Sequence, residues 1–430
     1  MKKYRVSFRD RLRNYKPFFF DNRIEWDKVF ALYITINDSL NCLGKRHMLE
    51  SFLYALDYAF FDKFQLEFNG KGRMILFYGL FNWRKDHYSV FKKFSSKFDF
   101  ATVAYPKPIE KKIQVLRGLQ YLIMMLVWFM QALLCGYGIK KSFVMLRTLV
   151  ICNRIDDFVE KLLSNDETLF VTYYDASPDE AYCVQKAKIH GKVTATLQHG
   201  IFCRKERQKA LSDTAFEYSE SNSDYYLGWN QYTKDEWSRI GLDENKFIMA
   251  GIPRYIDHHF KTYNTNNCSQ KKIFGVMLNN SSFDLHNKSL IKMANLIAES
   301  YNIKYVVRYH PELIPNSYDD LIDKKYFYGV SDNNMSIESY SNTVDFTIIS
   351  SSSVMVDLVY LNKNVYRLKV TNEDTYNNIN DNAFSTINEF RRIVNNSEGM
   401  EKVRRYLCTI DDVKETYSSI FKDLSKRVTI

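Results

Sequence analysis

Short apolar segments alternate with amphipathic helical segments from about residue 74 onward, and this alternation limits the possible folds more than any other feature. The expected strands of the first half are 74–80, 98–105, 168–175, 193–197, 225–229 and 247–253, and its expected helices are 85–96, 110–163, 177–191 and 231–240. The expected strands of the second half are 273–279, 304–310, 326–330, 345–350 and 364–368, and its expected helices are 285–300, 336–342 and one that begins at 353. Repeated strand–helix units of this kind predict parallel sheets covered by helices, an α/β fold.

The chain of 430 residues is longer than one hydrophobic core usually supports, because single cores stop growing at about 250–300 residues. A polar, Asn-rich segment without apolar periodicity, residues 257–272, separates the two series of strands. We therefore predict a first domain over 1–256, a linker over 257–272, a second domain over 273–405 and a C-terminal helix within 406–430. Residues 1–70 show mixed amphipathic patterns that assign no element.

Composition and charge narrow the function classes. The seven cysteines are scattered without a CxxC pair, which indicates neither a zinc site nor a disulfide framework and fits a reducing cytoplasm. The basic N-terminal segment lacks the apolar stretch of a cleaved secretory signal. The net charge of +10 is compatible with nucleic acid, an anionic membrane surface or an acidic small substrate. Because no RNA-recognition motif, zinc-finger spacing or basic recognition helix is present, we expect no nucleic-acid partner.

Residues 121–139 form a long apolar run in which Gln131 is the only strongly polar side chain. Basic residues bracket the run: Lys111, Lys112, Arg117, Lys140 and Lys141. The run is compatible with a buried helix, a helix lying in the interface of an anionic membrane, or a membrane span. A span would separate strand-forming segments that belong to one domain, which counts against it. Peripheral contact with the inner membrane therefore stays among the expectations.

Functional residues are expected where strands end, because ligands of open parallel sheets bind outside the carboxyl ends of the strands. The strand 193–197 is followed directly by Gln198, His199 and Gly200, and Gly200 has no side chain to crowd a ligand. A lone histidine in such a turn is equally compatible with a local hydrogen-bonding role. This strand end is therefore a candidate binding site, and the case for it depends on whether other strand ends carry similar residues.

Two strand ends in the second half carry polar groups of a similar kind. Arg308, His310 and Pro311 close the strand 304–310, and Pro311 holds His310 in an extended conformation. Guanidinium and imidazole groups donate hydrogen bonds to phosphate oxygens. Four consecutive serines, Ser350 to Ser353, join an apolar strand to an apolar helix, where hydroxyl and helix-start N–H groups favour an anion. Each end alone is compatible with an ordinary turn, but together they predict a phosphate-bearing ligand.

Four short motifs occur in order along the chain: QHG at 198–200, GIPRYID at 251–257, RYHP at 308–311 and SSS within 350–353. In order and spacing they resemble bacterial surface-polysaccharide glycosyltransferases of GT-B architecture. The most similar patterns are those of capsule Kdo transferases, bacterial sialyl- and polysialyltransferases, and CDP-glycerol glycerophosphotransferases. The resemblance covers about residues 165–390. It implies an α/β fold of two Rossmann-like domains that face each other across a cleft, with helical insertions in the N-terminal domain.

The resemblance also implies an activity and its partners. The expected reaction transfers a sugar from a nucleotide donor, with a CMP-linked sugar as the first expectation, to a growing capsule or lipopolysaccharide-type glycan. The expected catalysis uses neither a metal nor a cofactor, because protein groups neutralise the leaving phosphate. The expected partners are a nucleotide-activated sugar and a glycan or lipid-linked glycan acceptor, in the cytoplasm at the inner face of the membrane.

By analogy with the family's motifs, each candidate residue receives a role. His199 and His310 are the expected catalytic histidines, and the acceptor is expected to contact Gln198 and Gly200. The donor nucleotide is expected to contact residues of the second domain and the domain exit: Arg254, Arg308, His310, Ser350, Ser351, Ser352 and Ser353. The sialyltransferases' acidic base motif, two carboxylates followed by glycine, is missing, so Asp175 at a strand end is the candidate general base. A solvated aspartate at a helix entry is the alternative for Asp175.

The departures from the family leave other functions open. Glycerophosphotransferases usually carry an HGTP-type motif, whereas Ile201 and Phe202 follow Gly200 here, which weakens a CDP-glycerol or ribitol phosphate transferase without removing it. A nucleotide-sugar epimerase keeps the same fold with different chemistry. A non-catalytic nucleotide-binding relative that has lost its base is the third alternative.

Overall fold

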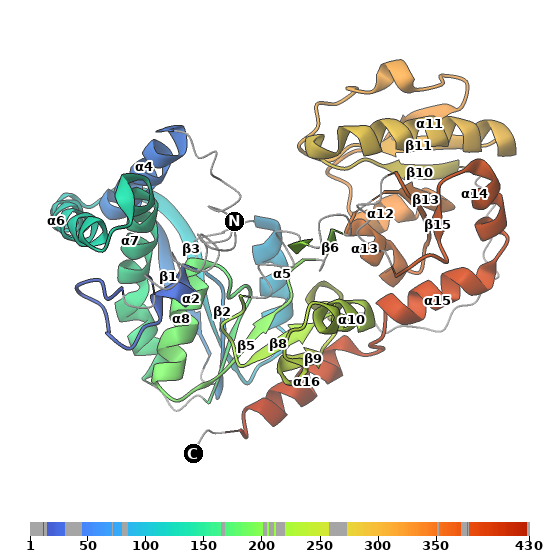
Figure 1. The fold of residues 1–430 in the computed structure, drawn as a ribbon. Helices are drawn as coiled ribbons and strands as arrows, with labels where there is room; N and C mark the ends of the chain where they lie inside the picture. The colour runs from blue at the N-terminus through green and yellow to red at the C-terminus, as the bar shows by residue number, and fades with distance from the viewer. Residues whose placement is uncertain are drawn as a thin grey trace.

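Two open sheets, one in each half of the chain, form the frame of the molecule (Figure 1). The computed structural model describes residues 12, 15–30, 45–70, 72–79, 85–164, 168–200, 204–205, 210–211, 220–257, 273–350, 352–370, 376 and 378–427. Within these residues the first sheet has the strand order β1-β3-β2-β4-β5-β8-β9 and the second has the order β12-β11-β10-β13-β14-β15. All neighbouring strands in the two sheets are parallel except β1 and β3. The predicted α/β fold with two parallel-sheet domains is confirmed.

The first domain contains the predicted strands and helices, together with elements that the sequence does not assign. Its strands are β1 (Phe61–Asn69), β2 (Met74–Phe77), β3 (Ala101–Ile113), β4 (Leu169–Thr172), β5 (Val193–Leu197), β8 (Tyr225–Gly228) and β9 (Phe247–Met249), and a small hairpin is formed by β6 (Arg204–Lys205) and β7 (Ala210–Leu211). Its helices are α2 (Trp26–Val29), α4 (Lys45–Phe60), α5 (Lys85–Ser95), α6 (Val115–Leu134), α7 (Gly138–Leu163), α8 (Pro178–Ile189), α10 (Gln231–Arg239) and the 3-10 helices η2 (Glu244–Lys246) and η3 (Pro253–Tyr255). The strand β3 continues to Ile113, beyond the predicted helix start at 110, because Ile113 pairs with Phe61 of β1.

Alternate residues of each central strand pack into different cores, as the two-residue period of a strand requires. Ile75 and Phe77 of β2 face the core that contains α7 and α8. Met74 and Leu76 of the same strand face a second core that contains α5 and the last helix of the chain. Both faces of the first sheet are therefore covered, which is typical of a doubly wound parallel sheet.

The second domain has the strand order of a classical dinucleotide-binding sheet, 3-2-1-4-5-6 in its own chain order. Its strands are β10 (Ile273–Met277), β11 (Lys304–Arg308), β12 (Phe327–Val330), β13 (Phe346–Ile349), β14 (Asn364–Leu368) and β15 (Ala383–Phe384). Its helices are η4 (Ser281–Phe283), α11 (Asp284–Tyr301), η5 (Asp319–Leu321), α12 (Ile337–Ser341), α13 (Val354–Tyr360), α14 (Ile387–Val394) and α15 (Ser397–Leu407). The order reverses between β10 and β13, so this domain has its topological switch point there.

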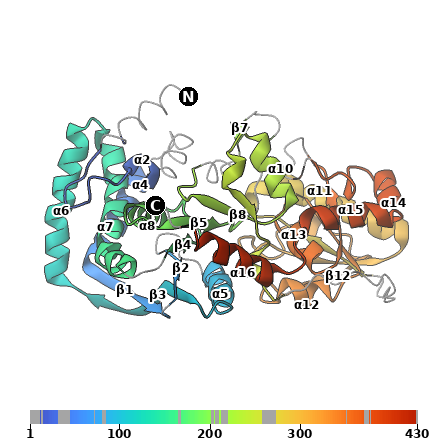
Figure 2. The same cartoon turned by 90° about the horizontal axis from the view of Figure 1, so that it is seen from below.

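The last helix, α16 (Val413–Leu424), returns to the first domain. Its buried residues Tyr417 and Phe421 belong to the core beneath the first sheet, and the Tyr417 hydroxyl donates a hydrogen bond to the carbonyl of Gly251 (3.0 Å). Figure 2 shows α16 between the first sheet and α15. The predicted domain boundaries remain predictions, and most of the predicted linker 257–272 lies outside the described residues.

A polar junction joins the two domains at η3. Arg254 pairs with Asp357 of α13 (3.0 Å), and the buried hydroxyl of Tyr255 donates to the same carboxylate (2.9 Å). The ring of Tyr255 also stacks on Tyr360, with 4.9 Å between the ring centroids. The end of the first domain is thus attached to the helix that follows the four serines.

The apolar run of residues 121–139 forms most of α6, which lies at the outer end of the first domain (Figures 1 and 2). Trp128 and Met125 are buried, whereas Leu116, Ile123 and Leu134 are exposed by 81%, 68% and 85%. The helix therefore packs against protein on one side only. It is the one helix among the described residues that is long and apolar enough to cross a membrane.

The domain junction generates a prediction about stability. We expect Asp357→Ala to lower the free energy of unfolding by about 1–3 kcal/mol, because it leaves the buried Tyr255 hydroxyl without an acceptor. Urea denaturation followed by circular dichroism measures the change. The matched control is Asp320→Ala, because Asp320 is an exposed aspartate on η5, away from the junction. Equal stability of the two variants would contradict the role of the junction.

Candidate active site

The switch point of the second sheet is lined by side chains that bond to one another. Asn279, two residues after β10, donates through Nδ2 to the Ser350 hydroxyl at the end of β13 (2.6 Å). Asn287 of α11 in turn donates to the carbonyl of Asn279 and accepts from its N–H group (3.0 and 2.8 Å). Ser350 is fully buried, so its hydroxyl contributes to the architecture of this edge.

The other serines lie closer to the surface of the same edge. Ser352 is half-buried, and its hydroxyl accepts from the Val354 N–H group (3.4 Å) while its carbonyl accepts from the Tyr376 hydroxyl (2.9 Å). Ser353 is exposed at the start of α13. Ser351 lies outside the described residues. Within the run 350–353, Ser352 and Ser353 are the described serines that a ligand can reach.

The turn after β11 presents the imidazole of His310. Its Nδ1 atom accepts from the Glu312 N–H group (3.2 Å), and its carbonyl accepts from the Leu313 N–H group (2.9 Å). These bonds close a turn around Pro311 and fix the ring. The ring is half-buried, and its Nε2 atom makes no hydrogen bond to the described residues, so Nε2 is the atom that a ligand would meet.

Arg308 lies at the same strand end but is held by the protein. One guanidinium nitrogen donates to the Met335 carbonyl (2.6 Å), and the group lies over the ring of Tyr340 at 5.3 Å from its centroid. Burial lowers the pKa of Arg308 below its usual value. The buried Nη1 atom has no hydrogen-bond partner among the described residues. The predicted contact between Arg308 and a donor phosphate therefore rests on this single nitrogen and stays a prediction.

In the first domain, Gln198 holds the turn that carries His199. Its amide donates to the Gly200 carbonyl (2.8 Å), and its side-chain oxygen accepts from the Trp229 N–H group (2.7 Å). Its own carbonyl accepts from the Trp229 indole (2.7 Å). Gln198 is buried and ties β5 to the end of β8, so the geometry favours a positioning role over the acceptor contact that the sequence predicts.

His199 belongs to an aromatic cluster at the carboxyl edge of the first sheet. Its ring lies 3.9 Å from the ring centroid of Tyr174, which follows β4, and 6.0 Å from that of His87 on α5. His87 also contacts Tyr173, with centroids 5.6 Å apart. Two imidazoles therefore lie together where the sequence predicts one.

The sequence analysis did not identify Asn279 and His87. Asn279 follows an apolar strand in the same way as Gln198, so the expectation that functional residues follow strand ends could have found it. His87 lies in the first turn of the helix after β2, so that rule finds it only when it is extended from the strand end to the following helix start.

Asp175, the candidate base, is buried with one carboxylate oxygen accepting three hydrogen bonds. The donors are the Ser221 hydroxyl (2.9 Å) and the N–H groups of Asn222 (2.8 Å) and Ser223 (2.7 Å). Burial raises the pKa of Asp175, and these hydrogen bonds oppose that rise. This arrangement anchors the loop before β8, and it favours a structural role over the general base.

A second buried carboxylate lies at the start of α8. Glu180 accepts from the N–H groups of Gly79 (2.9 Å) and Tyr174 (2.6 Å), which joins the ends of β2 and β4. Burial raises the pKa of Glu180 well above its usual range, and the neighbouring Asp179 raises it further. A side chain at position 79 would collide with this pair, because a Cβ atom there would lie 2.6 Å from Asp179 Oδ2.

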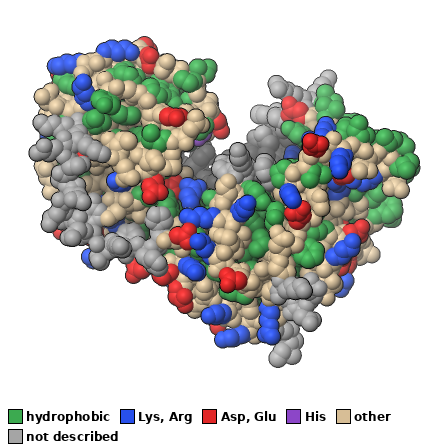
Figure 3. Space-filling model, turned by 180° about the vertical axis from the view of Figure 1, so that it is seen from behind, with side chains coloured by type: hydrophobic (Ala, Val, Ile, Leu, Met, Phe, Trp, Pro, Cys, Tyr) green, Lys and Arg blue, Asp and Glu red, His purple; other side chains and the backbone are tan. Residues whose placement is uncertain are grey.

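The two edges are connected through η3. Helix α5, which carries His87, packs against η3, and Arg254 of η3 pairs with Asp357 of α13 just beyond Ser352 and Ser353. Seen from behind, the molecular surface is hollowed between its two lobes (Figure 3). Arg254, predicted to contact the donor, is engaged in this junction.

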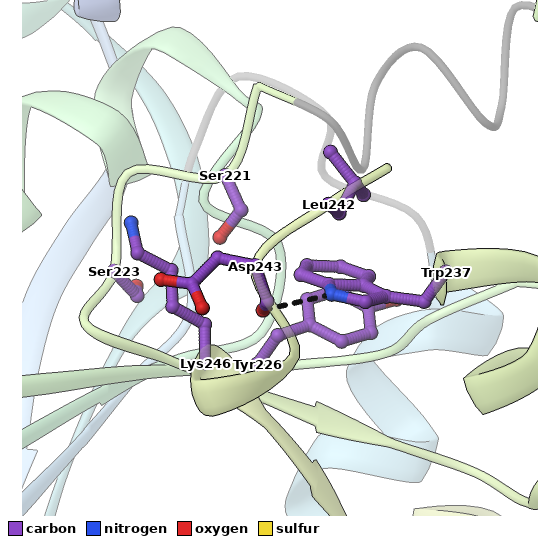
Figure 4. Close-up of a pocket in the computed structure, with 7 residues that line it drawn as sticks. All are labelled: Ser221, Ser223, Tyr226, Trp237, Leu242, Asp243 and Lys246. Atoms are coloured by element: carbon purple, nitrogen blue, oxygen red, sulfur yellow. Dashed lines mark hydrogen bonds between the residues drawn. The ribbon is translucent and has the colours of Figure 1, made fainter. Parts of the chain in front are cut away.

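A separate pocket of about 390 Å³, partly open to solvent, lies beside β8 (Figure 4). It is lined by Ser221, Ser223, Tyr226, Trp237, Leu242, Asp243 and Lys246. Apart from Tyr226 of β8, the lining residues lie in the segments that precede β8 and β9. Ser221 and Ser223 also donate hydrogen bonds to Asp175, so the pocket adjoins this candidate residue, whereas His199 does not line it.

No group of three or more metal-ligating side chains occurs within the described ranges. The cysteines that the structure describes, Cys135, Cys152, Cys183 and Cys408, are free thiols.

A scan against protein-family models found no match, and a search of curated proteins found none. Solved structures of similar architecture were found. UDP-GlcNAc 2-epimerase from Neisseria meningitidis, bound to UDP-GlcNAc, is 12% identical with a TM-score of 0.46, and the match covers 82% of this chain and 100% of that chain. The glycosyltransferase of kitacinnamycin is 9% identical with a TM-score of 0.47 and the same coverage. S. aureus TarM, in complex with UDP, is 13% identical with a TM-score of 0.42, over 64% of this chain and 58% of that chain. At these values the similarities assign no activity to this chain.

The anchor role of Asp175 predicts a loss of stability. We expect Asp175→Ala to lower the free energy of unfolding by about 2–4 kcal/mol, because buried N–H groups of the loop lose their acceptor. Urea denaturation measures it, with the exposed Asp411→Ala as the control. If Asp175→Ala is as stable as the control, the anchor role is wrong.

The raised pKa of Glu180 predicts a pH-dependent stability. The unfolded pKa of a glutamate is about 4.3, so the contribution of Glu180 is fully present below that pH and is lost as the pH rises through its higher folded-state pKa. We expect the free energy of unfolding of the unmodified protein, relative to Glu180→Gln, to fall as the pH rises from about 4.3 through the higher folded-state pKa of Glu180. Urea titrations across this range test it, with exposed Glu338→Gln as the control. A difference that is flat or rises with pH would contradict the shift.

Proposed function

We propose that this protein is a glycosyltransferase of GT-B architecture that transfers a sugar from a nucleotide donor to a bacterial surface glycan in the cytoplasm. One observation carries the proposal: imidazole groups occupy the carboxyl edges of both doubly wound sheets, and these edges are linked through η3. The order of the QHG, RYHP and serine motifs supports this reaction class. A CMP-linked donor and a capsule or lipopolysaccharide acceptor are the finer part of the proposal.

The donor phosphate is proposed to lie at the edge of the second sheet. His310 Nε2 and the hydroxyls of Ser352 and Ser353 are the groups there that a ligand can reach. When the bond between the anomeric carbon and the phosphate oxygen breaks, negative charge develops on that oxygen. Hydrogen bonds from the Nε2–H group of His310, whose Nδ1 atom accepts from the Glu312 N–H group, and from the serines would stabilise this charge, and no cofactor is required for that step.

The acceptor is proposed to lie at the edge of the first sheet. Its hydroxyl oxygen attacks the anomeric carbon, and its proton moves to a neighbouring base. Asp175 and Glu180 are buried and bonded to backbone N–H groups, which leaves the imidazole of His199 as the better placed base. Tyr174 and His87 orient that ring, and Gln198 fixes its turn.

The burial of both carboxylates also favours one alternative, a nucleotide-binding relative without turnover. Such a protein would keep the donor edge and lack a competent base. The alternatives differ in their products: a glycosyltransferase releases nucleotide only when an acceptor or water takes the sugar, whereas an epimerase converts the donor without releasing nucleotide.

The test uses the purified chain with CMP-, UDP- and CDP-linked donors, including CDP-glycerol, and follows nucleotide release and donor conversion separately. We expect His310→Ala and His199→Ala each to lower turnover on the order of a hundredfold, the size found when a transition-state donor or a base is removed. The control is His190→Ala, because His190 is an exposed histidine at the C-terminal end of α8 that pairs with Glu160, away from the sheet edges.

Three outcomes decide between the functions. Loss of turnover in both site variants with normal turnover in the control supports the transferase. Donor conversion without nucleotide release would replace it by an epimerase. Donor binding without turnover in the unmodified chain, for every donor of the panel, would replace it by the non-catalytic relative.

A further inference from the structure

The helix α6 has apolar residues around its whole circumference, but only one side packs against the protein. The buried residues Gly118, Tyr121, Met125, Trp128 and Ala132 recur at intervals of three and four and form one face. The exposed apolar residues form the opposite face: Val115, Leu116, Leu119, Leu122, Ile123, Leu126, Met130 and Leu134. Soluble monomers rarely expose an apolar face of this extent without a partner.

The packed side of α6 is fixed to the first domain by polar bonds and close contacts. Arg117 pairs with Asp62 (2.7 Å), and the Tyr121 hydroxyl donates to Asn153 of α7 (3.1 Å). A Cβ atom at Gly118 would lie 2.1 Å from the ring of Phe60, so only a glycine allows α6 to approach α4 this closely. The helix is therefore a built part of the domain, and its bare face remains at the surface.

A loop with two further exposed aromatic residues is bonded to the C-terminal half of the helix. The Trp128 indole donates to the Phe18 carbonyl (2.8 Å), and Gln131 accepts from the Phe18 N–H group (3.2 Å). These bonds hold the loop that carries Phe18 and Phe19 against α6, and the two phenylalanines are exposed by 59% and 61%. Figures 1 and 2 place α6 at the end of the first domain that points away from the second domain.

Charge identifies the kind of surface that fits this face. No aspartate or glutamate occurs between Glu110 and Asp156, although the segment includes all of α6. Lys112 is exposed before the helix and Lys140 is exposed after it, whereas the exposed Lys111 pairs with Asp57 (3.2 Å). An apolar face with basic ends and no acidic residue complements an anionic lipid surface. If a second copy of the chain bound through the same face, the basic residues at the ends of the two helices would lie close together.

We propose that α6 lies in the plane of an anionic phospholipid bilayer, with its exposed face between the headgroups and the acyl chains. The lysines at both ends contact the headgroups. The packed face keeps the helix from crossing the bilayer. The first domain is thereby bound to the membrane through the side opposite the second domain, which remains in the aqueous phase.

The test measures binding of the full chain to phosphatidylcholine vesicles with and without roughly one third phosphatidylglycerol, by cosedimentation without any substrate. The variant is the double substitution Leu119→Gln and Leu126→Gln, at residues exposed by 50% and 63%. The control is Leu296→Gln and Leu285→Gln on α11, at residues exposed by 47% and 61%. Circular dichroism checks that both variants are folded.

We expect binding that depends on phosphatidylglycerol and weakens at high salt, and a loss of about tenfold or more in the α6 variant with little change in the control. The proposal is overturned if the unmodified chain does not bind the anionic vesicles, or if both variants weaken binding equally. It is also overturned if the chain is a dimer that the α6 variant dissociates. Because no substrate is present, these outcomes are independent of the glycosyltransferase proposal.

Discussion

The parallel direction of neighbouring strands is the constraint on which the candidate site depends. Because β2, β4 and β5 run the same way, the residues that follow them meet at one edge, although they come from distant parts of the chain. Tyr174 and His199 meet there, and α5 brings His87 to the same place. The second sheet repeats the arrangement with Asn279, His310 and Ser350 at its own carboxyl edge.

The polar groups at these edges fall into two sets: buried groups that bond to the protein and groups that a ligand can reach. Gln198, Asp175, Glu180 and Ser350 are buried, and each bonds to a neighbouring loop or strand. A buried polar group without such partners would cost stability, so these residues are best understood as the supports of the edges. The imidazoles of His199 and His310 and the hydroxyls of Ser352 and Ser353 are the groups that we propose to act on the substrates.

The sequence predicts the short, fully buried strands well, and it predicts poorly those strands whose pairing partner lies far along the chain. The short apolar strands are recognisable because both faces of each sheet are covered. In contrast, β1 is only half-buried and pairs antiparallel with the far end of β3, so its register depends on residues some distance along the chain. Contacts between distant residues are equally hard to predict. The sequence around Arg254 does not indicate its ion pair with Asp357, and the sequence around Asp175 does not indicate the hydrogen bonds that it accepts from the loop before β8.

The apolar run at 121–139 shows a further limit of sequence reasoning. Composition identifies a helix with apolar residues on all sides, but it does not say which side other elements cover. The structure shows that Trp128 and Gly118 lie on the packed side, and a lipid surface is our proposal for the partner of the exposed side.

The central claim is that the two sheet edges form one reaction site, with the donor phosphate at His310 and Ser352 on the second sheet and the donor sugar reaching His199 on the first. Hydrogen–deuterium exchange, read by mass spectrometry during a titration with nucleotide-activated sugars, tests it most directly. The account predicts that peptides containing His199 and peptides containing His310 and Ser352 gain protection at the same donor concentration. Protection at only one of the two edges, or at neither edge with every donor, would contradict it.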